Sequence, residues 1–291
     1  MQGAPTLLFC VGATKAGTSW LHDYLSGHPD CHLRGVKELH YFDCHDLGAG
    51  WALADLKARI AKAEAALASA RPERALELAA KLADLKALLK LLRQPVDEAA
   101  YVAYLTEGRG EEKLVADLTP AYSLLSAERL RQMAGLLPDV RFLYILRDPI
   151  ARLWSHVRMI ARRRGGTGTV ASGQAARILE GVIAGREEAI AVRSDYRGAL
   201  ERLRAAVDPA RLMVAFHEEL LTVPGIGALC GFLGIGQRPA DLERRVHEGV
   251  QLAMQPVQVQ AARDWLRPQY DYVERTMGRL PHAWHRALTE V

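Results

Sequence analysis

The sequence predicts an α/β fold with a central, mostly parallel sheet and an inserted helical hairpin. Short apolar runs rich in β-forming residues alternate with segments of helical apolar spacing, which is typical of strands joined by helical crossovers. A glycine-containing turn directly follows the first apolar run. A long stretch rich in Ala, Leu and Lys interrupts the alternation and accounts for the hairpin.

The composition supports one globular domain over residues 1–291. Of the 291 residues, 49% are apolar and 25% are charged, which suffices for a substantial core. The net charge of +4 favours an anionic ligand but is too small to indicate nucleic acid. A small phosphorylated ligand fits this charge equally well, and we expect no nucleic acid partner.

The cysteines and the N-terminus bear on the compartment. The 4 cysteines have no CxxC spacing, so we expect free thiols. The first residues lack the basic and long apolar regions of a signal sequence, and no stretch approaches the length of a bilayer span. We expect a cytoplasmic chain without a transmembrane segment.

Three apolar runs predict strands of the sheet. They are Thr6–Val11, Val140–Leu146 and Arg211–Phe216. Helical spacing follows the first run over Ser19–Leu25 and the second from about Pro149 onward. Parallel strands connected in this way are expected to have right-handed crossovers.

The segment 51–93 predicts two antiparallel helices. Apolar residues recur at alternating intervals of three and four on both sides of Pro72, and a proline suits the first turn of a new helix. We favour packing, or self-association into a homo-oligomer, as the role of this hairpin. The alternative is a lid or wall over a substrate site.

The segment Arg162–Thr169 joins a basic run to a glycine-rich stretch and predicts a surface loop. Such a loop can be a solvated turn or can attract an anionic ligand. The sequence leaves both alternatives open.

The segment Gly12–Ser19 predicts an anion-binding turn between a strand and a helix. Backbone N–H groups and the positive end of the helix dipole converge there on an anion. A kinase loop places lysine directly after the second glycine, where this chain has Thr18. Lys15 lies three residues earlier, where it can still reach a 5′-phosphosulfate. We therefore predict a P-loop-like three-layer fold.

Two segments resemble the sulfotransferases that use 3′-phosphoadenosine 5′-phosphosulfate (PAPS). Lys15–Leu21 is similar to that family's 5′-phosphosulfate loop, and Phe142–His156 to its 3′-phosphate-binding strand, turn and helix. The resemblance implies transfer of a sulfuryl group from PAPS to an acceptor hydroxyl or amine. The residues that it implies for donor binding are Lys15, Ala16, Gly17, Thr18, Ser19, Trp20, Arg147 and Ser155.

Arg147 and Ser155 also make chemical sense as a phosphate site. A guanidinium at the carboxyl end of a strand forks onto phosphate oxygens, and a hydroxyl on the following helix can reach the same group. The structural alternative is that Arg147 pairs with Asp148 or another carboxylate.

A third segment, Val36–Asp43, resembles the K-E-x-H-[FY]-F segment of carbohydrate-type sulfotransferases, such as those acting on heparan sulfate. The resemblance implies that Glu38 is the base that takes the acceptor proton. Lys37 and Lys15 would stabilise charge near the bridging oxygen. His40 is the rival base, because its ordinary pKa lies near neutrality.

Asp117 and Tyr122 lie in a stretch similar to the family's T-P-x-Y segment and are predicted to contact the acceptor. An Asp before a proline-containing turn has an ordinary turn-forming role as well. The R-K-G-x-x-G segment of the cytosolic aryl and steroid enzymes is absent, so the residues that close over the adenine are unassigned.

No metal is predicted, because zinc-type Cys and His clusters are missing and lysines can handle the charge of one sulfuryl group. The expected acceptor is a small molecule or the hydroxyl of a glycan or glycolipid. One alternative is a P-loop kinase in which Asp148 serves magnesium. Another is a noncatalytic nucleotide-binding or scaffold protein whose partner surface is the hairpin.

Overall fold

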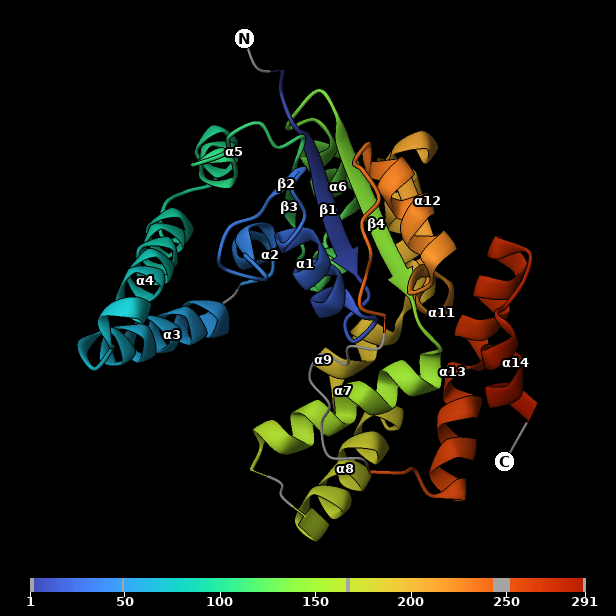
Figure 1. Ribbon diagram of the computed structural model, residues 1–291. Coiled ribbons are helices and arrows are strands. Elements are labelled where there is room, and N and C mark those ends of the chain that lie inside the picture. Colours follow the sequence, from blue (N-terminus) through green and yellow to red (C-terminus); the bar gives the residue numbers. More distant parts are fainter. Residues whose placement is uncertain (1–2, 49, 166–167, 243–251, 290–291) are drawn as a thin grey trace.

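The protein has one parallel sheet at its centre (Figure 1). The computed structural model describes residues 3–48, 50–165, 168–242 and 252–289. In this part of the chain the sheet order is β2-β3-β1-β4-β5, and every neighbouring pair is parallel. The strands are β1 (Thr6–Gly12), β2 (Cys31–His32), β3 (Leu114–Asp117), β4 (Val140–Leu146) and β5 (Leu212–Phe216).

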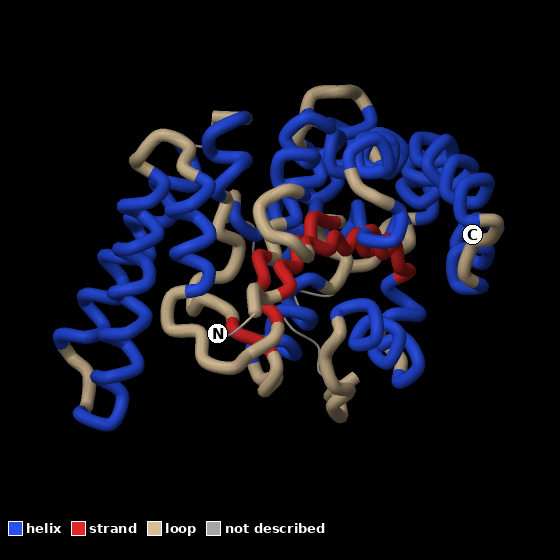
Figure 2. Tube along the Cα trace, turned by 90° about the horizontal axis from the view of Figure 1, so that it is seen from above, coloured by secondary structure: helices blue, strands red, loops and turns tan. Residues whose placement is uncertain are grey.

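Helices cover both faces of the sheet and give the fold three layers (Figure 2). The helices before β4 are α1 (Thr18–Ser26), α2 (Tyr41–Asp46), α3 (Gly50–Ala68), α4 (Pro72–Leu92), α5 (Glu98–Thr106), η1 (Pro120–Leu124) and α6 (Ala127–Ala134). Those between β4 and β5 are α7 (Pro149–Arg163), α8 (Gly168–Ile183), α9 (Glu188–Ala191), η2 (Val192–Ser194), α10 (Tyr196–Ala206) and η3 (Pro209–Arg211). After β5 come α11 (His217–Leu220), α12 (Val223–Leu233), α13 (Pro256–Met277) and α14 (His282–Thr289). The predicted α/β fold is confirmed.

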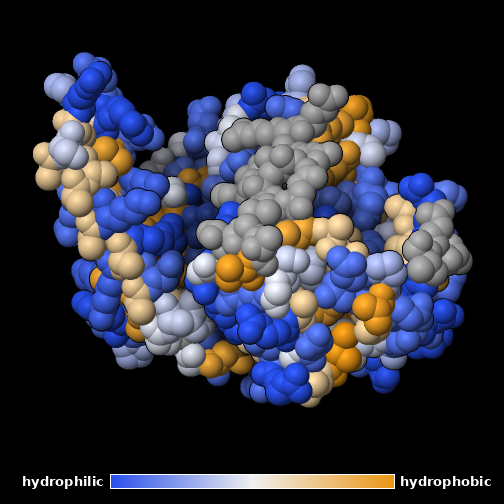
Figure 3. Space-filling model, turned by 90° about the horizontal axis from the view of Figure 1, so that it is seen from below, coloured by the Kyte–Doolittle hydropathy of each residue, from blue (hydrophilic) through white to orange (hydrophobic). Residues whose placement is uncertain are grey.

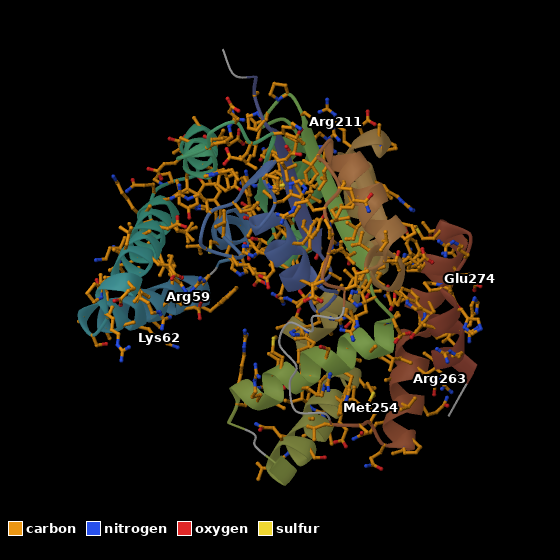
Figure 4. The ribbon with its side chains drawn as sticks, in the orientation of Figure 1. Arg59, Lys62, Arg211, Met254, Arg263 and Glu274 are labelled. Carbon is orange, nitrogen blue, oxygen red and sulfur yellow. The ribbon has the colours of Figure 1, made fainter. Side chains whose placement is uncertain are left out.

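The core is built around the two central strands, β1 and β4. Both read as continuous apolar runs because they are covered on both faces, and Leu7, Phe9 and Phe142 have no exposed surface. All five strands point the same way, so their carboxyl ends meet at one edge of the sheet. Arg211, directly before β5, marks the opposite edge (Figure 4).

The predicted hairpin is present as α3 and α4. Pro72 opens α4 as expected, and Leu56, Ile60, Leu85 and Leu88 are buried along the apolar stripes. The hairpin projects from the sheet as an arm, which we call the hairpin arm (residues 50–92) (Figure 1). Its assignment as an insertion within a single domain over 1–291 stays a prediction.

Three details differ from the sequence expectations. β2 and β3 were not predicted, and residue 211 belongs to η3, so β5 begins one residue later than expected. The expected loop at 162–169 is shorter, because α7 continues to Arg163 and α8 begins at Gly168. Residues 166–167 lie outside the described residues.

The cysteines and the helix lengths bear on two further expectations from the sequence. The 4 cysteines are free thiols, as predicted. Among the described helices, none combines the length and the apolarity that crossing a membrane requires.

Candidate functional site

The turn between β1 and α1 has the backbone of an anion cradle. Gly17 precedes α1 with a φ of 93°, a left-handed conformation that favours glycine. A Cβ at this position would lie 2.8 Å from the His217 Nδ1 atom. The Gly17 backbone therefore lies so close to His217 that a side chain at this position would require one of them to shift. The N-terminus of α1, with its unpaired N–H groups, opens directly onto this turn.

The two predicted donor segments meet at the carboxyl edge of the sheet. Arg147, which follows β4, donates a hydrogen bond from Nη1 to the Lys15 carbonyl at 2.9 Å. The buried Tyr196 hydroxyl donates to the Arg147 carbonyl at 2.7 Å and holds that part of the backbone. Arg147 thus pairs with the backbone of the cradle, and its side chain makes no ion pair with Asp148 or any other described carboxylate.

Asp148 serves the helix that follows β4. Its carboxylate accepts hydrogen bonds from the Ala151 N–H at 2.7 Å and from the Tyr270 hydroxyl at 2.6 Å. It therefore caps α7, and burial raises its pKa. The side chain is occupied in a buried structural role, which argues against the magnesium role of the kinase alternative. Ser155 lies half-buried on the same helix.

Lys37 connects the third predicted segment to the cradle. Its Nζ atom donates to the Ser19 hydroxyl at 2.6 Å and to Glu38 Oε1 at 3.0 Å. Ser19 stands in the first turn of α1, so one ammonium group contacts both the anion-binding turn and a carboxylate. The structure therefore brings Lys15, Lys37 and Glu38 to one edge of the sheet.

Glu38 and His40 form an ion pair whose protonation is well defined. His40 Nε2 lies 3.7 Å from Glu38 Oε2, and His40 Nδ1 lies 2.8 Å from Asp43 Oδ2. Burial raises the pKa of Glu38, but His40 and Lys37 outweigh it and lower that pKa to about 2. Burial lowers the pKa of His40, but the two carboxylates raise it to about 9. At neutral pH Glu38 is ionised and His40 is cationic.

Backbone strain concentrates on the same residues. Among the described non-glycine residues, the left-handed ones are Lys15, Glu38 and His40, with φ of 71°, 58° and 53°. Such conformations cost about 1–3 kcal/mol each and cluster at functional sites. All three residues were singled out from the sequence, Glu38 largely through the family resemblance.

Asp117 and Tyr122 lie beneath this segment. Asp117 is buried and accepts hydrogen bonds from Tyr122, Tyr101 and Thr119, at 2.7, 2.7 and 2.6 Å. Tyr122 also accepts from the Tyr41 N–H at 3.0 Å, next to His40. In this structure both side chains support the backbone of the Glu38 segment, and their contact with an acceptor stays a prediction.

A buried cationic group lies beside the cradle and was missed by the sequence analysis. Arg152 has no exposed surface and donates only to the Ser194 hydroxyl among the described residues, while its Nε and Nη1 atoms lack partners. One helical turn later, burial and Arg152 lower the pKa of His156 to about 3. The resulting excess of positive charge is suited to a polyanionic ligand.

Arg193 adds a further cation on the side of Glu38. Burial lowers its pKa, while the carboxylates of Asp43 and Glu38 act in the opposite direction. Its Nη1 atom donates to the Ala189 carbonyl at 2.6 Å. No short-range signal identifies Arg193, because η2 reaches this place only through the packing of α7 and α9.

Trp20 borders a surface hollow of about 180 Å³. Its ring stacks on Tyr24 with centroids 5.6 Å apart, and its Nε1 atom donates to the Asp241 carbonyl at 2.8 Å. Pro239 and Ala240 line the other side of the hollow. The hollow therefore lies against α1, the helix that the cradle opens, and charged side chains such as Asp23 and Arg238 also line it.

No group of three or more His, Cys, Asp or Glu residues that could hold a metal is found within the described residues. That the chemistry needs no metal stays a prediction.

The geometry of the sheet and the cradle defines a class of protein. A parallel sheet whose first strand enters an anion cradle, with an arginine from the next strand on the cradle backbone, is a P-loop-like α/β fold. A family model described as "Sulfotransferase family" matches residues 5–238. The chain belongs to this family.

Solved structures share the fold. A sulfotransferase from Alicyclobacillus acidocaldarius is 22% identical with a TM-score of 0.63, over 98% of this chain and 100% of that chain. A sulfotransferase domain from the curacin biosynthetic pathway is 20% identical with a TM-score of 0.50, over 81% of this chain and 76% of that chain. No curated protein matches the chain. These findings do not support the narrower resemblance to the heparan-sulfate branch.

Proposed function

We propose that this protein transfers a sulfuryl group from PAPS to an acceptor hydroxyl or amine. The observation that carries the proposal is the placement of Lys37, whose ammonium group contacts both Ser19 in the cradle and Glu38. A site for a phosphosulfate and a group able to accept a proton are thus adjacent. Family membership supports the sulfuryl chemistry.

The donor is proposed to bind along the carboxyl edge of the sheet. The backbone N–H groups of Ala16, Gly17 and Thr18 would hold the 5′-phosphosulfate, with the hydroxyls of Thr18 and Ser19 as further donors. Lys15 supports this assignment, since its Nζ atom pairs with no described carboxylate. Burial and Arg147 lower its pKa, a condition that a bound anion would reverse.

The 3′-phosphate is assigned to Arg147 and Ser155. Arg147 spends one guanidinium N–H on the Lys15 carbonyl, which leaves others for phosphate oxygens. Ser155 is half-buried on α7, two turns beyond the strand end. The hollow beside Trp20 supports this residue as the contact for the adenine, because a planar base is stabilised on an aromatic face.

The transfer is a single in-line displacement. The acceptor oxygen forms a bond to sulfur as the bond between sulfur and the bridging phosphate oxygen breaks. The acceptor proton passes to Glu38, and Lys15 and Lys37 stabilise the charge that develops on the bridging oxygen. The leaving group is 3′-phosphoadenosine 5′-phosphate.

The protonation states favour Glu38 over His40 as the base. His40, with a pKa of about 9, is already protonated at neutral pH and has no free ring nitrogen to accept the proton of the acceptor. Glu38 is ionised and keeps 37% of its side chain exposed, so an acceptor can reach it. A carboxylate of low pKa is a weak base, yet it suffices where the proton leaves late, after most of the sulfur transfer. His40 then orients Glu38.

The donor assignment is tested by comparing two nucleotides that differ only in the 3′-phosphate. We expect 3′-phosphoadenosine 5′-phosphate to raise the melting temperature far more than adenosine 5′-phosphate, and ATP with magnesium to have little effect. In Arg147→Ala the preference for the 3′-phosphate should fall by about 10–100-fold in binding constant.

Calorimetric titration of both nucleotides separates a lost phosphate contact from a damaged cradle. A damaged cradle would weaken both nucleotides equally. Stabilisation by ATP with magnesium alone would refute the proposal in favour of a kinase, and stabilisation by no nucleotide would refute it in favour of a scaffold.

A further inference from the structure

The hairpin arm brings one exposed aromatic side chain to the catalytic segment. Trp51 lies in the first turn of α3 and is 54% exposed. Its ring centroid lies 4.8 Å from that of His40, with the rings nearly perpendicular at 81°. His40 in turn lies 3.7 Å from Glu38. The exposed indole is therefore one residue removed from the proposed base.

Such exposure is costly for the largest apolar side chain in a protein. An aromatic side chain typically buries 150–250 Å² and gains most of its free energy from doing so. Of the other tryptophans, Trp20, Trp154 and Trp284 are at least nine-tenths buried, and Trp265 is partly buried against the core. Trp51 differs from them in leaving more than half of its surface to solvent next to three charged groups.

The position of the arm explains how Trp51 reaches the site. The arm forms a projecting column at the left of Figure 3, and a hollow separates it from the rest of the surface. Arg59 and Lys62 lie farther along α3, away from the sheet (Figure 4). The first turn of α3 contacts the segment Val36–Asp43 through the Trp51–His40 pair, and Asp84 on α4 accepts a hydrogen bond from the Val36 N–H at 3.1 Å.

We infer that Trp51 is a specificity-determining residue that receives the ring of the acceptor. The proposed acceptor is a hydroxyl carried on a ring with an apolar face, either an aryl ring or a pyranose. Placing that face on the indole would bury both surfaces and hold the hydroxyl toward Glu38. This inference rests on the proposed sulfuryl transfer, and it makes the hairpin arm a wall of the acceptor site.

The class of ligand follows from the surroundings of the indole. His40 beside the indole is charged and pairs with Glu38, which in turn pairs with Lys37, so these groups offer polar contacts at the rim only. A flexible linear alcohol gains little from one flat surface, because it must lose rotational freedom to lie on it. A rigid ring loses less conformational entropy on binding and can contact the indole with its whole face.

The test measures acceptor binding by calorimetry to the complex with 3′-phosphoadenosine 5′-phosphate, so that it needs no turnover. The probes are 2-naphthol, methyl β-D-glucopyranoside and 1-hexanol. Wild type should bind one of the ring compounds at least about tenfold more tightly than hexanol, and the preferred ring tells an aryl acceptor from a sugar. Trp51→Ala should remove this preference, and Trp51→Phe should keep most of it.

Leu76→Ala is the matched control, because Leu76 is 82% exposed on the other helix of the same arm. It should leave all three affinities unchanged. The inference is wrong if wild type binds neither ring compound better than hexanol, or if Trp51→Ala weakens the three probes equally. Failure of the proposed function shows separately, as loss of stabilisation by 3′-phosphoadenosine 5′-phosphate in the wild type.

Discussion

The carboxyl edge of the sheet and the hairpin arm contribute to the site in opposite ways. At the sheet edge, Lys15 and Arg147 come from segments far apart in sequence and are fixed by buried groups such as Tyr196. The arm is exposed over most of its length and reaches the site through Trp51. The comparison indicates that the proposed donor half of the site is built by the core, whereas the arm adds one side chain to the proposed acceptor half.

Charge differs between the two regions as well. On the arm, Lys86 pairs with Glu64 at 2.7 Å, and the mostly buried Arg34 pairs with Asp84 of α4 at 2.7 Å. Lys15 and Arg152 at the sheet edge have no ion-pair partner among the described residues. Unpaired cations in a partly buried place destabilise the fold, and a bound anion would offset that loss of stability.

Glu38 stands where the two regions meet, and its replacement should have the largest effect. Glu38→Gln keeps the shape but cannot take the acceptor proton, so the transfer rate should fall by about 10²–10⁴-fold. Stabilisation by 3′-phosphoadenosine 5′-phosphate should remain, because the cradle is intact. The measurement is sulfate transfer from labelled PAPS to the fastest acceptor in a panel of phenols, glycosides and alcohols.

The control for Glu38→Gln is Glu201→Gln, which alters an exposed carboxylate paired with Arg197 on α10. Its rate should equal that of the wild type. An undiminished rate in Glu38→Gln would show that another group takes the proton.

The ion pair between His40 and its carboxylates should make stability depend on pH. His40 has a pKa of about 9 in the folded protein and an ordinary value near 6.5 when unfolded. Its stabilisation is therefore fully present below pH 6.5 and is lost as pH rises through 9. Relative to His40→Gln, the wild-type free energy of unfolding should fall by about 2–3 kcal/mol between pH 6 and pH 10.

Urea unfolding of both proteins at several pH values measures this difference. The comparison with His40→Gln cancels the titration of other groups. A difference that stays constant over this range, or that grows with pH, would contradict the protonated state assigned to His40.

The smallest effect is expected from a change in the backbone of the cradle. Gly17→Ala places a methyl group where φ is 93° and His217 is 2.8 Å away, so the turn must shift. Binding of 3′-phosphoadenosine 5′-phosphate should weaken about tenfold, as measured by calorimetry. Gly231→Ala is the control, because a Cβ there meets nothing within 4 Å on α12; equal affinity of the two variants would contradict the cradle.

The donor half was readable from the sequence because its signals are local. An apolar run, a glycine turn and helical spacing in succession define β1, the cradle and α1. A second apolar run, followed by Arg147, Asp148 and a helix that opens on Pro149, defines β4 and α7. Because β1 and β4 are covered on both faces, their sequences are continuous apolar runs, which distinguish them from helices and loops. β2 has only two residues and β3 only four, too few for a period to be visible.

The places of Trp51 and Arg152 were not readable because their contacts depend on how distant elements pack. Trp51 lies in a helix predicted from a leucine stripe, and nothing in that stripe indicates that its first turn would meet His40. Arg152 belongs to an amphipathic helix and would ordinarily face solvent, yet it is fully buried. Sequence patterns specify which face of a helix is apolar but not what that face covers.

The left-handed residues at the site have a consequence for adaptation to heat. Lys15, Glu38 and His40 occupy conformations in which glycine avoids a penalty of about 1–2 kcal/mol. At Glu38 and His40 the ion pair offsets this penalty, whereas Lys15 pairs with no described carboxylate, so selection for heat stability alone would favour glycine at Lys15 and would remove the cation proposed to hold the donor. Heat stability and the proposed activity therefore favour different residues at this position.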